Sequence, residues 1–289
     1  MQIHSSWTER VARTQAIMSA SWQILREDKT LLFLPIAASA CLMFLTASFA
    51  VPVILGTLTG ASVSDDFLQH ESWSYVSMFL FYVVTYGIAI FFNAALAICV
   101  LRKLEGKQAT ILDGLREALS CFPQILGWAL VSATIGVILT AIERRAGFVG
   151  SMVARALGLA WSVATFLVVP VLVAERKSPA DAIQESVQLL RRTWGEDLLS
   201  GLGFGLLSFF WAIPGVFAFI IGAGMIVSHP ILAIAIMVLA ILYFPLLGLV
   251  LSTMSTIFDV VLYRYARAGT IAPGFDRELL QTTFVAKSK

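Results

Sequence analysis

Six long apolar runs constrain the fold of this chain more than any other feature of its sequence. They cover residues 31–56, 73–101, 122–142, 153–174, 198–227 and 231–261, and none has a lysine or arginine near its centre. About 20 mostly apolar residues suffice for a helix to cross a bilayer. Because the bilayer core offers no hydrogen bonds to the backbone, runs of this kind cross it as helices. The sequence therefore predicts six transmembrane helices.

The amino-acid composition also indicates a membrane protein. Hydrophobic residues make up 58% of the 289 residues and charged residues 13%, whereas soluble domains contain about 45–50% and about 25%. A soluble globule of this length has no interior large enough for so much apolar surface. We therefore exclude a soluble enzyme, a nucleic-acid-binding domain and a disordered chain. We expect an all-α, polytopic membrane helix bundle.

Cysteine usage and the N-terminal segment bear on processing. Cys41, Cys99 and Cys121 lie within or beside apolar runs, which predicts small buried hydrophobic residues rather than a disulfide framework. Residues 1–30 mix acidic and basic side chains, and no small-residue cleavage site follows the first apolar run. We therefore expect that run to be a retained span and not part of a signal peptide.

The basic residues are distributed unevenly between alternate loops. Seventeen of the 20 lysines and arginines precede the first span, lie between spans two and three or four and five, or follow the sixth. The other three are Arg144, Arg145 and Arg155. Positive residues accumulate on the cytoplasmic side of membrane proteins. Both termini are therefore predicted to be cytoplasmic, while the exact topology between the third and fourth spans stays open.

Three segments that precede spans one, three and five have the pattern of amphipathic helices. Apolar side chains recur at helical spacing, with charged side chains elsewhere, in residues 7–25, 111–122 and 183–194. This pattern is typical of a helix that lies in a membrane interface. Thr110 with Asp113 and Ser178 with Asp181 are start signals for the second and third of these helices.

The unit of one amphipathic helix and one span hairpin thus occurs three times. We expect a single membrane domain, 1–289, that comprises an N-terminal amphipathic helix (1–30), hairpin 1 (31–101), a second helix and hairpin (107–174), a third (178–263) and a cytoplasmic tail (264–289). Ser21-Trp-Gln-Ile-Leu-Arg26 matches Ser186-Val-Gln-Leu-Leu-Arg191 at four of six positions, which supports the repeat. Three copies favour pseudo-threefold packing about the membrane normal over inverted repeats.

Several motifs resemble those of a known family. They are Val169-Pro-Val-Leu-Val-Ala-Glu175, Ser178-Pro-Ala-Asp-Ala-Ile-Gln-Glu-Ser186, Arg192-Thr-Trp-Gly-Glu196, Leu262-Tyr-Arg-Tyr-Ala266 and Gly274-Phe-Asp276. From Trp22 to Phe284 the chain resembles a bacterial family of uncharacterised six-span membrane proteins, a domain of unknown function. Its layout is similar to the membrane domain beside some glycerophosphodiester phosphodiesterases. We expect no appended catalytic domain, so the resemblance implies the architecture and a bacterial inner membrane but no activity.

Motifs of catalysis and cofactor binding are absent from the sequence. His4, His70 and His229 are scattered, and neither His-Glu-x-x-His nor Gly-x-Ser-x-Gly occurs. Gly201-Leu-Gly-Phe-Gly205 lacks the spacing of a nucleotide-binding loop, but Gly201 and Gly205 have the spacing that lets membrane helices approach closely. We expect helix packing there, and we expect no catalytic residue, no cofactor and no metal.

Polar residues within or at the ends of the apolar runs form a candidate pocket that faces the cytoplasm. They are Asn93, Glu175, Ser252, Ser255, Asp259 and Arg264. Ionisable groups in a membrane tend to face the bundle interior or water. Such a pocket would take a lipid headgroup or a small solute. The alternative is that these residues cap helix ends and form hydrogen bonds between helices, with Arg102, Lys103 and Arg264 as ion-pair partners of Glu175 and Asp259.

Aromatic and basic residues of the amphipathic segments form a second candidate surface, which would bind lipids or dock a partner protein. They are Trp7, Trp22, Arg26, Arg116, Arg191 and Trp194. Basic residues near the inner leaflet favour anionic headgroups. We expect membrane lipids as partners, a protein partner in a membrane complex as the docking alternative, and no nucleic acid.

Three functions are compatible with these features. The first is a non-catalytic membrane scaffold or assembly component, which the short external loops and the interfacial helices favour. The second is a lipid or small-solute transporter or channel, which the polar residues and glycines of the spans favour. The third is an intramembrane enzyme that acts on lipid, for which the sequence offers only Glu175 and Asp259 as an acid–base pair.

Overall fold

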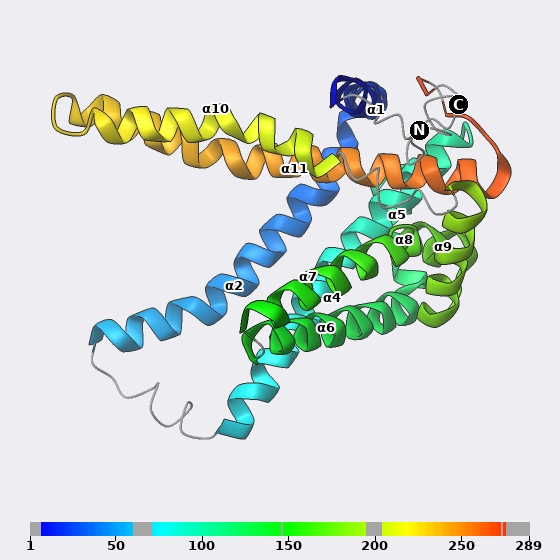
Figure 1. Ribbon diagram of the computed structural model, residues 1–289, viewed down its shortest axis with the longest axis horizontal. Helices are drawn as coiled ribbons and strands as arrows, with labels where there is room; N and C mark the ends of the chain where they lie inside the picture. The colour runs from blue at the N-terminus through cyan, green and yellow to red at the C-terminus, as the bar shows by residue number, and fades with distance from the viewer. Residues whose placement is uncertain (1–6, 60–70, 146, 195–203, 273, 276–289) are drawn as a thin grey trace. The chain divides into compact units, whose positions relative to one another are not determined.

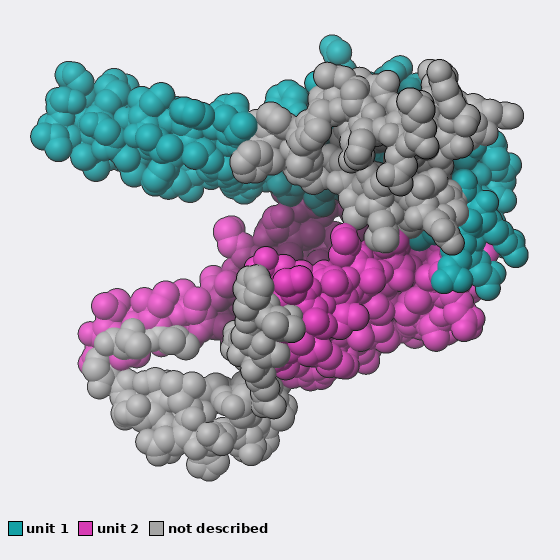
Figure 2. All heavy atoms as spheres, in the orientation of Figure 1, with its two compact units in different colours: residues 1–32, 188–289 teal, residues 33–187 magenta. Residues whose placement is uncertain are grey.

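The structure, a computed structural model, describes residues 7–59, 71–145, 147–194, 204–272 and 274–275. Within these ranges the regular structure is entirely helical (Figure 1). The chain divides into two compact units (Figure 2). Unit 1 consists of Met1–Leu32 and Gln188–Lys289, and unit 2 consists of Phe33–Val187.

Five stretches in the described residues are long and apolar enough to cross a membrane. They are Lys29–Gly56, Phe79–Leu104, Phe122–Glu143, Gly150–Glu175 and Pro230–Ala268. The helices concerned are α2 (Phe33–Thr59), α4 (Glu71–Leu104), α6 (Phe122–Arg145), α7 (Gly147–Ala164) with α8 (Val168–Glu175), and α11 (Pro230–Ala268). The chain is therefore a multi-pass membrane protein, and five of the six predicted spans have counterparts here.

The remaining predicted span, 198–227, lies partly outside the described residues. Its described part is α10 (Phe204–Gly224), which contains Pro214 and ends in the apolar stretch Trp211–Gly224. The predicted packing glycine Gly201 also lies outside the described residues, and Gly205 lies in the first turn of α10.

Unit 2 is organised around α4. This helix packs against α2, α6, α8 and α5 (Ile111–Ser120), and α6 packs against α7. The stretch of α4 from 94 to 100 is completely or almost completely buried, and three of its seven residues are alanines. Small side chains let membrane helices approach closely. At Gly114 of α5 the approach is closest, because an added Cβ would overlap Cys99 Sγ and lie 2.8 Å from the Ala95 carbonyl oxygen.

The fourth predicted span is a broken helix. α7 ends at Ala164 and α8 begins at Val168, with a turn between them. Pro170 explains the break, because proline cannot donate the hydrogen bond that the Phe166 carbonyl would receive in a continuous helix. The hydropathy of the run is continuous across this point, so the predicted span from 153 to 174 has a counterpart in Gly150–Glu175, but the break within it was not predicted from the sequence.

Unit 1 contains α1 (Trp7–Glu27), the 3₁₀ helix η1 (Lys29–Leu32), α10 and α11. α10 and α11 run side by side as a hairpin, and α1 packs against both (Figure 1). Gly215 and Gly222, two turns apart on α10, allow the close approach. An added Cβ would lie 2.6 Å from Tyr243 Cδ1 at the first and 2.7 Å from Met237 Cγ at the second.

The prediction that the cysteines are buried is correct for two of the three. Cys99 and Cys121 are buried and unoxidised, whereas Cys41 is exposed on α2. The prediction for Cys41 was wrong because an apolar run in a membrane protein has faces that protein does not cover. Hydropathy alone does not distinguish such a face from one packed against another helix.

Candidate functional site

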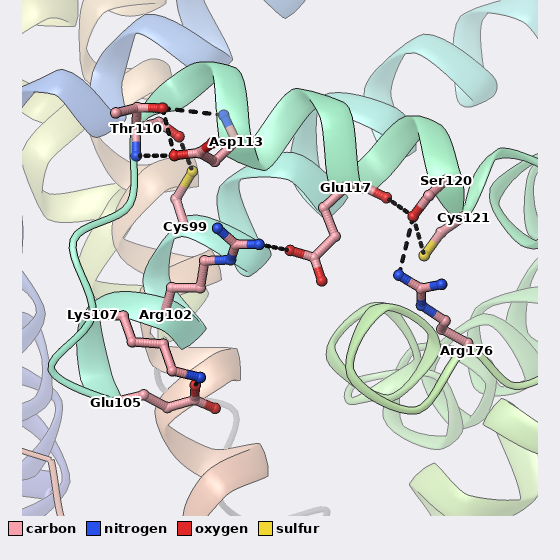
Figure 3. Close-up of polar contacts among 10 residues, drawn as sticks. All are labelled: Cys99, Arg102, Glu105, Lys107, Thr110, Asp113, Glu117, Ser120, Cys121 and Arg176. Carbon is pink, nitrogen blue, oxygen red and sulfur yellow. Dashed lines mark hydrogen bonds and ion pairs between the residues drawn. The ribbon is translucent and has the colours of Figure 1, made fainter.

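A cluster of polar residues joins the ends of spans α4 and α8 to the amphipathic helices α5 and α9 (Pro179–Trp194). All its members belong to unit 2. We call it the junction cluster, and it comprises Arg102, Thr110, Asp113, Glu117, Ser120, Glu175, Arg176, Lys177 and Glu185. Figure 3 shows the part of the cluster around α5.

The first element of the junction cluster is the start of α5. The Thr110 N–H donates to Asp113 Oδ2 at 3.1 Å, and the Asp113 N–H donates to Thr110 Oγ1 at 3.2 Å, which completes a capping box. Hydrogen bonds from the side chain and backbone N–H of Thr110 hold the pKa of Asp113 below its ordinary value, and Arg102 and Arg116 contribute electrostatically. The predicted start signal is therefore confirmed, and it fixes where α5 begins.

An ion pair connects the end of α4 to the middle of α5. Arg102 Nη2 lies 2.6 Å from Glu117 Oε2, and both side chains are half-buried (Figure 3). The sequence had suggested Arg102 as a partner of Glu175 or Asp259. The residue it pairs with is Glu117, because α5 turns back along the end of α4.

Arg176 connects the end of α8 to the end of α5. Its guanidinium donates a hydrogen bond to Ser120 Oγ at 3.3 Å, and Ser120 Oγ donates to the Glu117 carbonyl at 2.7 Å (Figure 3). The backbone of Arg176 is left-handed, with φ of 50° and ψ of 34°, at the C-cap of α8. Sequence reasoning missed this residue, because its partner is 56 positions away.

Lys177 connects α8 to α9. Its Nζ lies 2.7 Å from Glu175 Oε2 and 3.0 Å from Glu185 Oε2. Hydrogen bonds to these two carboxylates raise the pKa of Lys177, so the side chain remains charged. At the start of α9 the Asp181 N–H donates to Ser178 Oγ at 3.3 Å, as the predicted start signal requires. The lysine was not among the residues that the sequence singled out.

The six residues of the predicted polar pocket are described in two separate units. Asn93 and Glu175 belong to unit 2, where Asn93 is half-buried in α4 and Glu175 is part of the junction cluster. The other four residues lie on α11 in unit 1: Ser252, Ser255, Asp259 and Arg264. Among the described residues, none forms a hydrogen bond with the buried Oδ1 of Asp259. The pocket itself stays a prediction.

The predicted interfacial residues lie on α1, α5 and α9. Trp22, Arg26, Arg116 and Arg191 are exposed, and the side chains of Trp7 and Trp194 lie outside the described part. The two serines of the sequence match, Ser21 and Ser186, are both fully buried, and each is followed by two buried aliphatic residues three and four positions later. In both helices the matched serine and leucine therefore occupy the packed face, whereas the matched glutamine and arginine are exposed.

The junction cluster holds two amphipathic helices against the membrane spans. It contains carboxylates and cations, but no group of three or more potential metal ligands converges anywhere in the described ranges. Chemically, this arrangement pairs Arg102 and Lys177 with carboxylates at the ends of the spans, and these pairs link α5 and α9 to the spans.

Comparison with known proteins gives one match. A family model described as a family of unknown function (DUF6159) matches residues 72–274, more than two thirds of the chain. No curated protein and no solved structure matches the chain. The matched region begins within α4 and includes the whole junction cluster. The chain therefore belongs to the family of unknown function DUF6159.

Proposed function

We propose that this multi-pass membrane protein is a non-catalytic scaffold or assembly component of a membrane complex. In this proposal a single domain of six spans, arranged as three tandem units of interfacial helix and hairpin, lies in the bacterial inner membrane. Both termini and the junction cluster face the cytoplasm, in accordance with the distribution of basic residues.

The observation that carries the proposal is the way α9 is held. Lys177 links Glu185 of this helix to the end of α8, and Ser186 contributes a buried hydrogen bond to the same span. The opposite face of α9 is exposed and polar, with Asp181, Gln184, Gln188, Arg191 and Arg192. A polar helix face that is held rigidly needs little ordering when a partner binds. It suits a soluble or peripheral protein rather than lipid.

Native mass spectrometry of the full chain in discs of its own membrane tests this proposal. We expect a fixed additional protein mass at constant stoichiometry. A photoreactive residue in place of Gln184 should crosslink to that same protein. The matched control is a photoreactive residue in place of Leu130, which is exposed on span α6 and should crosslink to lipid. Monomers or homo-oligomers without a second protein, in both experiments, would overturn the scaffold proposal.

One observation favours a second candidate, a lipid or small-solute transporter or channel. The buried Oδ1 of Asp259 on span α11 has no hydrogen-bond partner among the described residues. Buried carboxylate oxygens are normally hydrogen-bonded, so an unpartnered one is a candidate contact for a polar solute. Flux of small solutes or fluorescent lipids into reconstituted vesicles, abolished by Asp259→Asn, would support this function. Equal flux with both proteins would exclude a role for Asp259.

A further inference from the structure

The outward face of α5 is apolar although the helix lies outside the spans. Leu112 is 62% exposed, Leu119 60% and Phe122, just after the helix, 47%. Only Cys121 separates α5 from span α6, which begins at Phe122. The C-terminal end of α5 must therefore lie at the surface of the membrane. An exposed apolar face in this position contacts the boundary between headgroups and acyl chains.

The cations beside this face, Arg116 and Arg176, form no salt bridge with an acid of the described ranges, although Arg116 interacts electrostatically with Asp113. Asp113 is engaged by Thr110, and Glu117 by Arg102. Arg116, on the outward face, forms no hydrogen bond or salt bridge with any residue of the described ranges. Arg176 donates one hydrogen bond, to the neutral hydroxyl of Ser120. Two guanidinium groups thus remain available around Ser120, which lies one turn after Arg116.

The backbone of Arg176 indicates that its side chain matters. A φ of 50° is a conformation that glycine adopts at little cost and that other residues adopt at a penalty. The chain has an arginine at this C-cap nonetheless. Glu175, which precedes Arg176 in the sequence, and Glu185 of α9 are both held by Lys177. The Arg176 guanidinium is therefore free of a carboxylate partner within the described part and has donors to spare for a further anion.

We propose that Arg176, Ser120 and Arg116 bind the phosphate of an anionic phospholipid headgroup. A guanidinium presents paired N–H donors that match phosphate oxygens. Leu112, Leu119 and Phe122 lie against the start of the acyl chains of the same lipid. These apolar side chains point to a lipid rather than free phosphate as the source of the anion. The site does not depend on the scaffold function proposed above.

Native mass spectrometry of the full chain in detergent, with phosphatidylglycerol or phosphatidylcholine of the same acyl chains added, measures the binding. We expect the wild type to bind phosphatidylglycerol more tightly. One cation near a membrane surface contributes about 1 kcal/mol, so Arg176→Gly and Arg116→Gln should each weaken this binding about fivefold and together about thirtyfold. Lys107→Gln is the matched control. It removes the same charge from a lysine already paired with Glu105 at 2.7 Å and should leave binding unchanged.

Two readouts separate this site from its alternatives. Arg176→Gly relieves the strain of the left-handed backbone, so the melting temperature of this variant should not fall. If it does fall, the phosphatidylglycerol affinity of Arg176→Gln decides whether the Arg176 side chain binds the lipid. Inorganic phosphate at millimolar concentration should not displace the lipid. Equal affinity for the two lipids, wild-type affinity in both Arg176 variants, or displacement by inorganic phosphate would each overturn the proposal.

Discussion

Ser186 Oγ accepts a hydrogen bond from the buried backbone N–H of Leu167 at 3.2 Å, in the turn where the span of α7 and α8 is broken. Unsatisfied backbone groups are costly inside a membrane protein, because no water is present to bind them. α9 thus completes the hydrogen bonding of the span that precedes it in the chain. This bond makes the amphipathic helix a structural part of the bundle.

Ser186→Ala should therefore destabilise the protein. The substitution leaves the Leu167 N–H without its acceptor, at a cost of about 1–3 kcal/mol. Ser21→Ala is the matched control, since Ser21 is equally buried and its Oγ has no hydrogen-bond partner in the described residues. Thermal unfolding in detergent should show a lower midpoint for Ser186→Ala alone. Equal shifts for the two variants would contradict the assigned role of the bond.

The ion pair of Arg102 and Glu117 should contribute modestly to stability. Both groups are half-buried, and pairs near a surface contribute about 0.2–1 kcal/mol. A cycle of Arg102→Gln, Glu117→Gln and the double variant should give a coupling energy in this range that decreases with added salt. A coupling energy of zero at low salt would show that this ion pair does not hold α5 against α4.

Asp113 should make stability depend on pH at the acid end. The pKa of Asp113 in the folded protein is below the ordinary value of 3.8 for an aspartate side chain. A lowered pKa stabilises the folded state above the unfolded pKa, and the contribution is lost as the pH falls through the folded pKa. The unfolding free energy of the wild type should therefore exceed that of Asp113→Asn at pH 7, and the difference should shrink below about pH 3.8. A difference independent of pH would rule out ionisation as its cause.

The features predicted correctly from the sequence are those that depend on neighbouring residues in the chain, namely the positions of spans and the start of a helix. Run length and apolar character located α2, α4, α6 and α11, and Thr110 with Asp113 gave the start of α5. The broken span was missed because hydropathy does not report one absent N–H, although Pro170 was a signal for it.

The contacts of the junction cluster depend on tertiary structure. Arg176 forms a hydrogen bond with Ser120, 56 positions away in the sequence, and Lys177 forms salt bridges with two acids on different helices. Periodicity shows that α5 and α9 are amphipathic, but it does not show which charged residues will meet. The exposure of Cys41 could not be predicted for a similar reason. Apolar residues occur both where a span faces lipid and where it packs against another helix, so the residue type does not distinguish the two.

Gly114→Ala should destabilise unit 2 by separating α5 from α4. The added Cβ would lie 2.8 Å from the Ala95 carbonyl oxygen and would overlap Cys99 Sγ, so the helix itself has to move. Overpacking of this kind costs about 1–3 kcal/mol.

Gly248→Ala on α11 is the matched control, because an added Cβ there has no neighbour within 4 Å in the described part. Alanine is the better helix former by up to about 1 kcal/mol, so the control should be neutral or stabilised. Thermal unfolding, together with the reactivity of Cys99 toward a thiol reagent, measures both effects. Unchanged stability and unchanged Cys99 protection in Gly114→Ala would mean that α5 does not pack on α4 as described.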